Sequence, residues 1–407
     1  MSLSLLRRTT AVLAGAGLAL AGCSGAEEST SSASSTSSTS SSVSATSTTT
    51  SQSSEGITVT DIVGRTVTLD KLPERIILGE GRGVFATGIL DKTDPLEHIV
   101  AIGSDLKANV PDYYTHFVNQ FPEVESLPEI GHIAKGDVTV ENLVSLNPDV
   151  ILFTKDQYDA AQTTGLDKQI DDAGLTYIVT DFRQHPLENT TRSMEIFGAV
   201  FGHENEAAAF NKEWQQTVDS IKAKATPDGK SVFVWRAAGV SDCCGTWNNS
   251  NISELVNAAG GKNIGDSILD GESGAVTPEK VIEQNPEVII ATGGDWSAKK
   301  DKEGNPVGYI ALGYDISADQ AQASVNAGPD LQPGFDTLQA VQTGDFHAMW
   351  HQFYNSPFNY VALLQIAKWV NPEAFADIDV AAAWKASQDT YSPVSAAGTF
   401  FSTAEAK

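Results

Sequence analysis

Three arginines stand at positions where a partly buried cationic side chain could bind an anion. The sequence has only six arginines after residue 23, and Arg82, Arg183 and Arg236 each occur in a loop that follows a predicted strand. A guanidinium group presents paired donors to carboxylate and similar anionic oxygens and tolerates partial burial. In a chain whose formal net charge is −26, arginines in such loops predict a site for an anionic ligand.

The same loops contain aromatic and imidazole side chains. Flat apolar walls with a few convergent polar groups are typical of sites for large organic ligands. His351 or Tyr354 could also coordinate a metal, because imidazole nitrogen and tyrosine oxygen both serve as ligands of transition-metal ions. The plain alternative for His351 is a hydrogen-bonded loop histidine. The candidate contacts are His132, Tyr158, Trp235, Trp247, Trp296, Trp350, His351 and Tyr354.

These loops connect short apolar strands to helices, in two series. Strand–helix alternation of this kind predicts a parallel sheet covered on both faces, and ligands of such sheets lie beyond the carboxyl ends of the strands. Between the series, residues 188–226 are nearly all helix-forming, and one long helix is expected over roughly 204–226. The predicted fold is therefore α/β: two Rossmann-like lobes joined by a single long helix, with the ligand cleft between the lobes.

One fifteen-residue segment occurs twice. Residues 138–152 read "VTVENLVSLNPDVIL" and residues 276–290 read "VTPEKVIEQNPEVII", with no gap in the alignment. Each copy is predicted to form a helix, an Asn-Pro turn and a buried strand. The two copies should therefore occupy equivalent places in the two lobes.

The helix of the first copy has an apolar period of three to four residues. Val140, Leu143 and Val144 are expected on its buried side, with Leu146 as a further candidate at its end. Glu141 and Glu279, the third residue of each predicted helix, are expected to be exposed on the opposite side. Considered alone, both are acids of the kind that the helix dipole favours at a helix start.

The first 54 residues predict an export signal and a tether. Two arginines precede an apolar stretch that is too short to span a bilayer, and it ends in "LAGC", which looks like a bacterial lipobox with Cys23 as the lipidated residue. A plain secretory signal with a chance cysteine is the alternative. Residues 24–54 are almost wholly Ser, Thr and Ala and are expected to form a flexible leash.

Charge and cysteine content exclude several classes of function. A chain this acidic is a poor partner for nucleic acid, which requires a basic surface. The cysteines lack zinc-type spacing. Cys243 and Cys244 are adjacent, and both a vicinal disulfide and two free thiols remain open.

Five segments in one order resemble a known family. "DIVGRTVTLDKLPERIILG", "VTVENLVSLNPDVILF", "ELVNAAGGKNIGD", "VTPEKVIEQNPEVIIAT" and "LQAVQTGDFHAM" are similar to markers of the class III substrate-binding proteins of ABC importers for iron complexes, haem and cobalamin, which have a single-helix bridge. The similarity extends over about 57–390. Together with the lipobox, it predicts five segments. They are a signal peptide (1–23), a tether (24–54), an N-terminal lobe (55–187), a helical bridge (188–228) and a C-terminal lobe (229–407).

The resemblance implies a monomeric, exported, lipid-anchored binding protein with no enzymatic activity and no intrinsic cofactor. It would capture a ferric siderophore and deliver it to a permease and an ATPase, with Glu141 and Glu279 as the residues that dock on the permease. Haem or cobalamin is the alternative ligand. A free metal-ion receptor is disfavoured because none of the seven histidines lies in a His-rich loop. An exported hydrolase is disfavoured because no G-x-S-x-G or H-E-x-x-H motif is present.

Overall fold

The computed structural model describes residues 56–226, 229–240, 243–296, 302, 304, 308–394 and 398–407. The predicted signal peptide with Cys23, and the predicted tether, lie outside the described residues. Within the described ranges, no helix is both long enough and apolar enough to cross a membrane.

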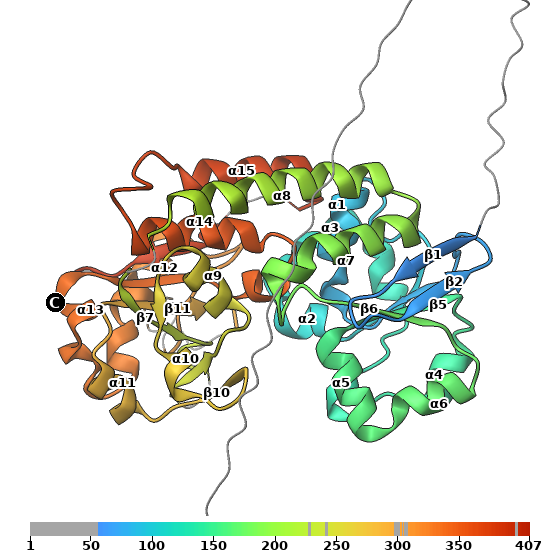
Figure 1. Ribbon diagram of the computed structural model, residues 1–407, viewed down its shortest axis with the longest axis horizontal. Coiled ribbons are helices and arrows are strands. Elements are labelled where there is room, and N and C mark those ends of the chain that lie inside the picture. The colour runs from blue at the N-terminus through green and yellow to red at the C-terminus, as the bar shows by residue number, and fades with distance from the viewer. Residues whose placement is uncertain are drawn as a thin grey trace, which may run out of the picture. The chain divides into compact units, whose positions relative to one another are not determined.

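The first lobe is built on a four-stranded parallel sheet in the order β4-β3-β5-β6, preceded by a β1–β2 hairpin (Figure 1). The strands β3, β5 and β6 are almost fully buried because helices cover both faces of the sheet. The strands are β1 Ile57–Thr60, β2 Thr66–Leu69, β3 Ile76–Leu78, β4 Ile99–Ile102, β5 Val150–Thr154 and β6 Tyr177–Thr180. The helices are α1 Val84–Leu90, α2 Asp105–Asn109, α3 Pro111–Gln120, α4 Val140–Ser145, α5 Lys155–Thr164 and α6 Leu166–Asp172, with 3-10 turns at Gly81–Gly83, Pro122–Ser126 and Ile133–Lys135.

The second lobe has a five-stranded sheet in the order β13-β12-β11-β7-β9, parallel except for the edge strand β13, and a small antiparallel β10–β8 pair. The strands are β7 Ser231–Trp235, β8 Gly245–Trp247, β9 Lys262–Asn263, β10 Ser273–Ala275, β11 Val288–Gly293, β12 Phe346–Trp350 and β13 Phe401–Thr403. The helices are α9 Ile252–Ala258, α10 Gly265–Ile268, α11 Pro278–Gln284, α12 Ala318–Asn326, α13 Gln339–Thr343, α14 Asn359–Val370 and α15 Val380–Tyr391, with 3-10 turns at Gly328–Leu331, Phe335–Thr337 and His351–Asn355.

A bridge of two helices, α7 (Pro186–Phe201) and α8 (Glu204–Lys224), connects the lobes, and α8 runs along both of them (Figure 1). Its buried face carries Phe210 and Trp214. Trp214 donates from Nε1 to Asn359 of α14 at 2.8 Å, and Asn359 donates to Thr190 of α7 at 2.8 Å. These contacts join both bridge helices to the second lobe. The two lobes and the helical bridge between them confirm the predicted fold class.

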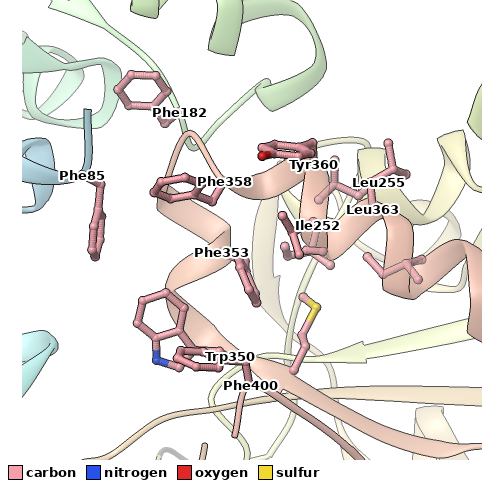
Figure 2. Packing of buried hydrophobic residues seen from close by; sticks show 14 of the residues in the cluster. Phe85, Phe182, Ile252, Leu255, Trp350, Phe353, Phe358, Tyr360, Leu363 and Phe400 are labelled. Carbon is pink, nitrogen blue, oxygen red and sulfur yellow. The ribbon is translucent and has the colours of Figure 1, made fainter. Parts of the chain in front are cut away.

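An apolar core continues from one lobe into the other (Figure 2). Phe85 of α1 contacts Trp350 of β12 edge to face, with ring centroids 6.1 Å apart. Tyr113 of α3 contacts Tyr314 in the same way at 5.4 Å. Beside them, Asp112 accepts a hydrogen bond from the backbone N–H of Tyr314 at 2.8 Å. The lobes are therefore in direct contact beneath the bridge.

The two copies of the repeated segment have the same local structure. Thr139 and Thr277 cap α4 and α11 by accepting a hydrogen bond from the backbone N–H three residues later. Asn147 and Asn285 have left-handed backbone conformations, with φ of 47° and 42°, and each leads through the Asn-Pro turn into a buried strand. Asparagine tolerates this conformation better than most residues.

The predicted burial of Val144 is wrong. Leu143 and its equivalent Val281 are fully buried, but Val144 is 47% exposed. The helix α4 has only six residues and contacts its lobe through a narrow side. Position 144 therefore falls just outside the buried stripe.

The question left open at residues 243 and 244 is settled, since Cys243 and Cys244 form a disulfide. Further along the second lobe, residues 351–355 form a separate 3-10 turn, and the helix α14 begins after it at Asn359 with Phe358 as N-cap residue.

Candidate functional site

The loop after β3 places a buried arginine at the boundary between the lobes. Asp105 fixes this loop: its carboxylate accepts hydrogen bonds from the backbone of Gly81 at 2.6 Å and from Nε of Arg82 at 2.9 Å. Gly81 has no room for a side chain, since a Cβ there would lie 2.3 Å from the carbonyl oxygen of Gly103. The guanidinium group of Arg82 thus points out of the first lobe in a fixed direction.

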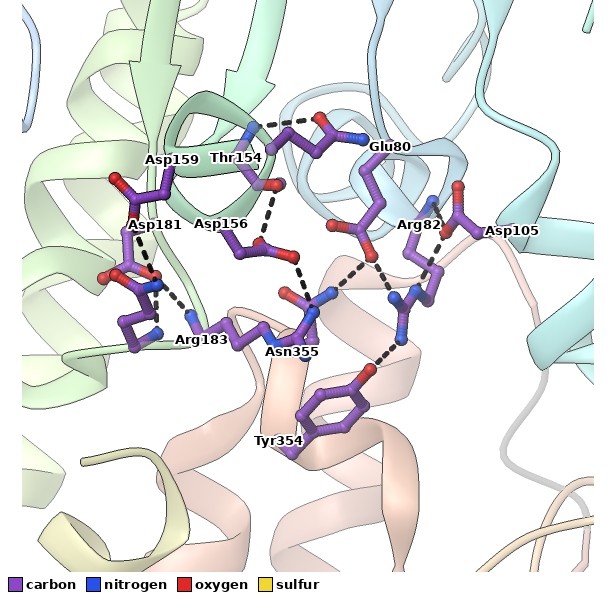
Figure 3. A network of polar contacts seen from close by, with 12 residues as sticks. Glu80, Arg82, Asp105, Thr154, Asp156, Asp159, Asp181, Arg183, Tyr354 and Asn355 are labelled. Carbon is purple, nitrogen blue, oxygen red and sulfur yellow. Dashed lines mark hydrogen bonds and ion pairs between the residues drawn. The ribbon is translucent and has the colours of Figure 1, made fainter. Parts of the chain in front are cut away.

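Arg82 and its neighbour Glu80 bind directly to the second lobe (Figure 3). Nη1 of Arg82 donates to the hydroxyl of Tyr354 at 2.7 Å and to the side chain of Gln352 at 3.0 Å. Glu80 pairs with Nη2 of Arg82 and accepts a hydrogen bond from Asn355 at 2.6 Å. Four polar side chains from the two lobes therefore surround one buried guanidinium group.

Arg183 approaches the same tyrosine from the loop after β6. Asp181 shapes this loop by accepting hydrogen bonds from the backbone N–H groups of residues 183, 184 and 185. The guanidinium of Arg183 pairs with Asp156 at 2.8 Å and lies 5.2 Å from the ring centroid of Tyr354. Tyr354 is thus the point where two arginines of the first lobe meet the second lobe.

Of the three arginines at the site, Arg236, in the loop after β7, has the fewest partners among the described residues. Its guanidinium lies 5.6 Å from the ring centroid of Trp247, and the indole of Trp247 lies 6.3 Å from the ring of Tyr354. Among the described residues, no carboxylate or other acceptor binds the Arg236 side chain. Burial, and then the charge of Arg183, lower the pKa of Arg236. A half-buried guanidinium that no described acceptor binds favours binding of an anion, because a charge-assisted hydrogen bond would offset the cost of its burial.

His351 lies beside these arginines in its neutral form. Its Nδ1 contacts the hydroxyl of Thr292 at 2.8 Å, and its ring centroid is 4.4 Å from that of Tyr354 and 5.3 Å from that of Trp296. Burial, followed by the charges of the three site arginines, lowers the pKa of His351 to about 3. Neutral imidazole is the form that binds metals.

Two small cavities flank Glu80 and Arg82. One lies against Phe182 and Asn355, and the other against His132 and Arg183. Each holds about 20 Å³, which is room for about one water molecule. Oε2 of Glu80 and Nδ1 of His132 are buried without a hydrogen-bond partner among the described residues. Burial raises the pKa of Glu80 to about 7.

Most of the predicted site residues lie together. A connected group around Tyr354 contains Arg82, His132, Arg183, Arg236, Trp247, Trp296, His351 and Tyr354. Three others lie elsewhere. Trp235 is 1% exposed and packs on Phe335 inside the second lobe. Trp350 is 2% exposed in the core between the lobes, and Tyr158 faces Arg65 and Tyr177 at the side of the first lobe.

Sequence reasoning missed the polar residues that hold the arginines in place. Glu80, Asp105, Gln352 and Asn355 were not predicted. Glu80 and Asn355 had a usable signal, because both stand in the loops that were chosen for their arginine and tyrosine. Asp105 had none, since its role depends on two loops that lie 24 residues apart in the sequence.

Comparison with known proteins agrees with this architecture. A family model described as periplasmic binding protein matches residues 92–304, just over half of the chain. The chain belongs to this family. A search of curated proteins finds no match.

Three solved structures illustrate the likeness. The TroA-like periplasmic binding protein FepB from Veillonella parvula is 27% identical, covers 86% of this chain and 100% of its own, and has a TM-score of 0.74. The molybdate-bound MolA of Haemophilus influenzae is 17% identical (84% and 99% covered, TM-score 0.60). An Fe³⁺-hydroxamate transport protein of Saccharomonospora viridis is 20% identical (77% and 98% covered, TM-score 0.52). The last two likenesses concern the fold alone.

As a class III periplasmic binding protein, the chain is a solute-binding protein and not an enzyme. Binding proteins of this family act outside the cytoplasm and work with the permease and ATPase subunits of ABC importers. The site around Tyr354, at the carboxyl ends of the strands of both lobes, is in the place where ligands of open α/β sheets bind.

Proposed function

We propose that this periplasmic binding protein captures an anionic Fe(III) chelate of the siderophore class and delivers it to an ABC importer. The observation that carries the proposal is Arg236, a half-buried guanidinium that lies against the ring of Trp247 and has no hydrogen-bond acceptor among the described residues. In a chain of net charge −26, such a cation beside two further arginines selects for negative charge in the ligand.

The contacts of Arg82 support a site whose polar groups exchange partners on binding. Its bonds to Tyr354 and Gln352 occupy the space between the lobes, and the adjoining cavities hold about 20 Å³ each. Sites for organic ligands usually measure about 300–1,000 Å³. We therefore expect the chelate to separate the loops and to replace Tyr354 and Gln352 as acceptors for Arg82.

In this proposal His351 and Tyr354 are direct ligands of the metal ion in the chelate. His351 is neutral, and no described residue binds its Nε2. The hydroxyl of Tyr354 accepts a hydrogen bond from Nη1 of Arg82 at 2.7 Å, and the guanidinium of Arg183 lies 5.2 Å from its ring centroid. Haem is the second candidate, because its propionates would pair with the same arginines and His351 could bind its iron axially. Lipid attachment at Cys23 belongs to the same proposal.

The first test is a tryptophan-quenching titration of the purified protein with ferric catecholate, ferric hydroxamate, ferric citrate and haem. Binding of at least one ferric chelate at micromolar or tighter affinity is expected, because Trp247 and Trp296 line the site. The variant Arg236→Gln should weaken that binding about tenfold or more, as loss of one charge-assisted hydrogen bond does.

Arg192 on α7 provides the matched control, since Arg192→Gln removes an arginine that pairs with Glu188 outside the site. It should bind the chelates as the wild type does. Tight haem binding with a Soret band, together with no quenching by any ferric chelate, would replace the siderophore proposal by the haem one.

A further inference from the structure

Three side chains with metal-binding atoms meet where α7 turns into α8, at the end of the first lobe that is remote from the second lobe (Figure 1). Asp91 and Glu97 come from the loop between α1 and β4, and His203 lies in the turn between α7 and α8. One ligand atom of each residue lies within 4.8 Å of the ligand atoms of the other two. Two segments that are 106 positions apart thus bring one nitrogen and two oxygen ligands together, on half-buried side chains.

The turn between the bridge helices fixes the position of His203. Gly202 ends α7 in a left-handed conformation, with φ of 73°, and the backbone N–H of His203 donates to the carbonyl oxygen of Gly198 at 2.7 Å. Gly198 has no room for a side chain, since a Cβ there would lie 2.7 Å from the Cβ of Ala207 on α8. The two helices are therefore tightly packed at the turn, which holds the imidazole beside the loop of the first lobe.

Hydrogen bonds within the loop fix the two carboxylates. Oδ1 of Asp91 accepts from the backbone N–H and the hydroxyl of Thr93, both at 2.7 Å, and from the N–H of Asp94 at 3.2 Å. The carbonyl oxygen of Asp94 accepts in turn from the N–H of Glu97 at 3.2 Å. Burial acts to raise the pKa of Asp91, but the hydrogen bonds from Thr93 and Asp94 outweigh it and lower the pKa. Asp91 is thus an ionised carboxylate, which is the form that binds metals.

The imidazole of His203 has a carboxylate near each ring nitrogen, but neither at an ordinary hydrogen-bond distance. Nε2 lies 3.5 Å from Oε2 of Glu97, and Nδ1 lies 3.6 Å from an oxygen of Glu206 on α8. N–H···O hydrogen bonds usually measure about 2.7–3.2 Å, whereas tetrahedral ligands at about 2.0–2.2 Å from a zinc ion lie about 3.3–3.6 Å from one another. The separation of Nε2 from Glu97 therefore fits two ligands of one ion. Glu206 stands where a carboxylate orients a metal-binding histidine through its other nitrogen.

The carboxylates of the cluster have no lysine or arginine to balance them. Among the described residues, neither kind of side chain pairs with Asp91, Glu97 or Glu206. Lys92 adjoins Asp91 but donates to a backbone carbonyl oxygen of α15 at 2.6 Å instead. The other basic neighbour is His98, whose Nε2 lies 3.3 Å from Oε1 of Glu97. In a chain of net charge −26, a divalent cation would neutralise charge that no described lysine or arginine offsets here.

We propose that Asp91, Glu97 and His203 bind a divalent transition-metal ion such as Zn²⁺, with water completing its coordination. Two carboxylate oxygens and one imidazole nitrogen suit such an ion, whereas Ca²⁺ takes about six to eight oxygen ligands. The ion is a resident part of the fold and not the transported ligand, because the cluster lies apart from the site around Tyr354. It ties the start of α8 to the first lobe, so the inference does not rest on the proposed function.

The test is calorimetric titration of the purified, chelator-treated protein with ZnCl₂ and, separately, with CaCl₂. One Zn²⁺ site of about micromolar or tighter affinity is expected, with Ca²⁺ bound at least about tenfold more weakly. Since an ion that binds only the folded state stabilises it, the melting temperature should rise with Zn²⁺. His203→Gln removes the nitrogen ligand and should weaken Zn²⁺ binding at least about tenfold, with loss of the rise in melting temperature.

His116→Gln is the matched control, because His116 is a half-buried histidine that also faces a carboxylate, that of Asp315 at 2.7 Å, outside the cluster. It should bind Zn²⁺ as the wild type does. Glu97→Gln is a second variant that keeps the imidazole, and it should weaken Zn²⁺ binding as His203→Gln does. Wild-type Zn²⁺ affinity in both His203→Gln and Glu97→Gln, equal weakening by His116→Gln, or wild-type binding only at millimolar Zn²⁺ overturns the inference.

Titration of the same variants with ferric citrate, ferric catecholate and ferric hydroxamate separates this result from the proposed function. His203→Gln should bind them with wild-type affinity, because the cluster does not belong to the site around Tyr354. The Zn²⁺ titration contains no ferric chelate, so a failure of all chelates to bind the wild type would refute the chelate proposal and leave the Zn²⁺ result readable.

Discussion

Glu80 and Arg236 set the charge of the site in opposite directions. Arg236 adds a cation that no described carboxylate pairs with, whereas Glu80 adds a carboxyl group in direct contact with Arg82. Burial raises the pKa of Glu80 to about 7, against the opposing effect of Arg82 and with support from the charges of Asp105 and Asp156. Its carboxyl group therefore changes charge close to neutral pH, and the site is more cationic when it is protonated.

The affinity for an anionic chelate should consequently depend on pH. As the pH falls from 8 to 6, protonation of Glu80 removes a negative charge from the site, and we expect wild-type affinity to rise severalfold. Glu80→Gln is neutral throughout, so it should bind more tightly than the wild type at pH 8 and similarly at pH 6. Titrating both proteins with one ferric chelate cancels the chelate's own protonation. Parallel pH profiles of the two proteins would contradict the assignment.

The sequence predicts a site residue correctly only where its place in a loop after a strand is enough to put its side chain in the site. Arg82, Arg183 and Tyr354 were found because they directly follow strands. Trp235 and Trp350 also end strands, but their side chains point into the core, and neither loop position nor residue type reveals the direction of a side chain at a strand end. The structure alone distinguishes the two cases.

At the scale of elements, the repeated helix–turn–strand is where sequence reasoning was most successful. Apolar periodicity, the Thr caps and the Asn-Pro turns are local signals, and both copies form the predicted elements. The position of Val144 was wrong because a six-residue helix has too few turns for periodicity to separate the buried stripe from its edge. Contacts between distant loops, such as that of Asp105 with residues 81 and 82, have no local signal at all.

The two turn asparagines should respond differently to substitution. Both have positive φ, but Asn285 also accepts a hydrogen bond from the backbone N–H of Gln339 at 2.9 Å. Asn147→Gly should be nearly neutral, since glycine adopts this conformation freely. Asn285→Gly should lower the free energy of unfolding by about 1 kcal/mol through the lost hydrogen bond.

Urea unfolding of the two glycine variants measures this difference. Asn147→Ala serves as the reference for backbone strain and should cost about 1–2 kcal/mol, because alanine disfavours the left-handed conformation. Equal stability of Asn147→Gly and Asn285→Gly would show that the hydrogen bond of Asn285 contributes nothing.

At the scale of the whole molecule, the contact between the lobes contains a buried aspartate whose ionisation destabilises the folded state. Burial raises the pKa of Asp112 to about 6, although the backbone N–H groups of Tyr314 and Tyr113 oppose the shift. In the unfolded chain the pKa returns to its ordinary value of about 3.9. The folded state therefore binds this proton more tightly than the unfolded state does.

The sign of the stability effect follows from that difference. The stabilising contribution of protonated Asp112 to the free energy of unfolding is fully present below about pH 4. It is lost as the pH rises through about 6. Asp112→Asn cannot ionise and retains an oxygen for the N–H of Tyr314, so its melting temperature relative to the wild type should increase from pH 4.5 to pH 7.5. Melting curves of both proteins across this range are the measurement, and a constant difference would argue against the raised pKa.

The hydrogen-bonded chain from Trp214 through Asn359 to Thr190 has a consequence for how a loaded protein is recognised. It fastens both bridge helices to the second lobe in the buried interior, and the Phe85–Trp350 contact joins the two lobes beneath it. A wide swing of one lobe would break this interior, so filling the site can bend the molecule only slightly. The ligand-free and ligand-bound conformations of the protein then differ little. An ABC importer that avoids ATP hydrolysis without transport would then need to contact the bound ligand itself, at the opening of the cleft. The conformation of the binding protein would give it too little information.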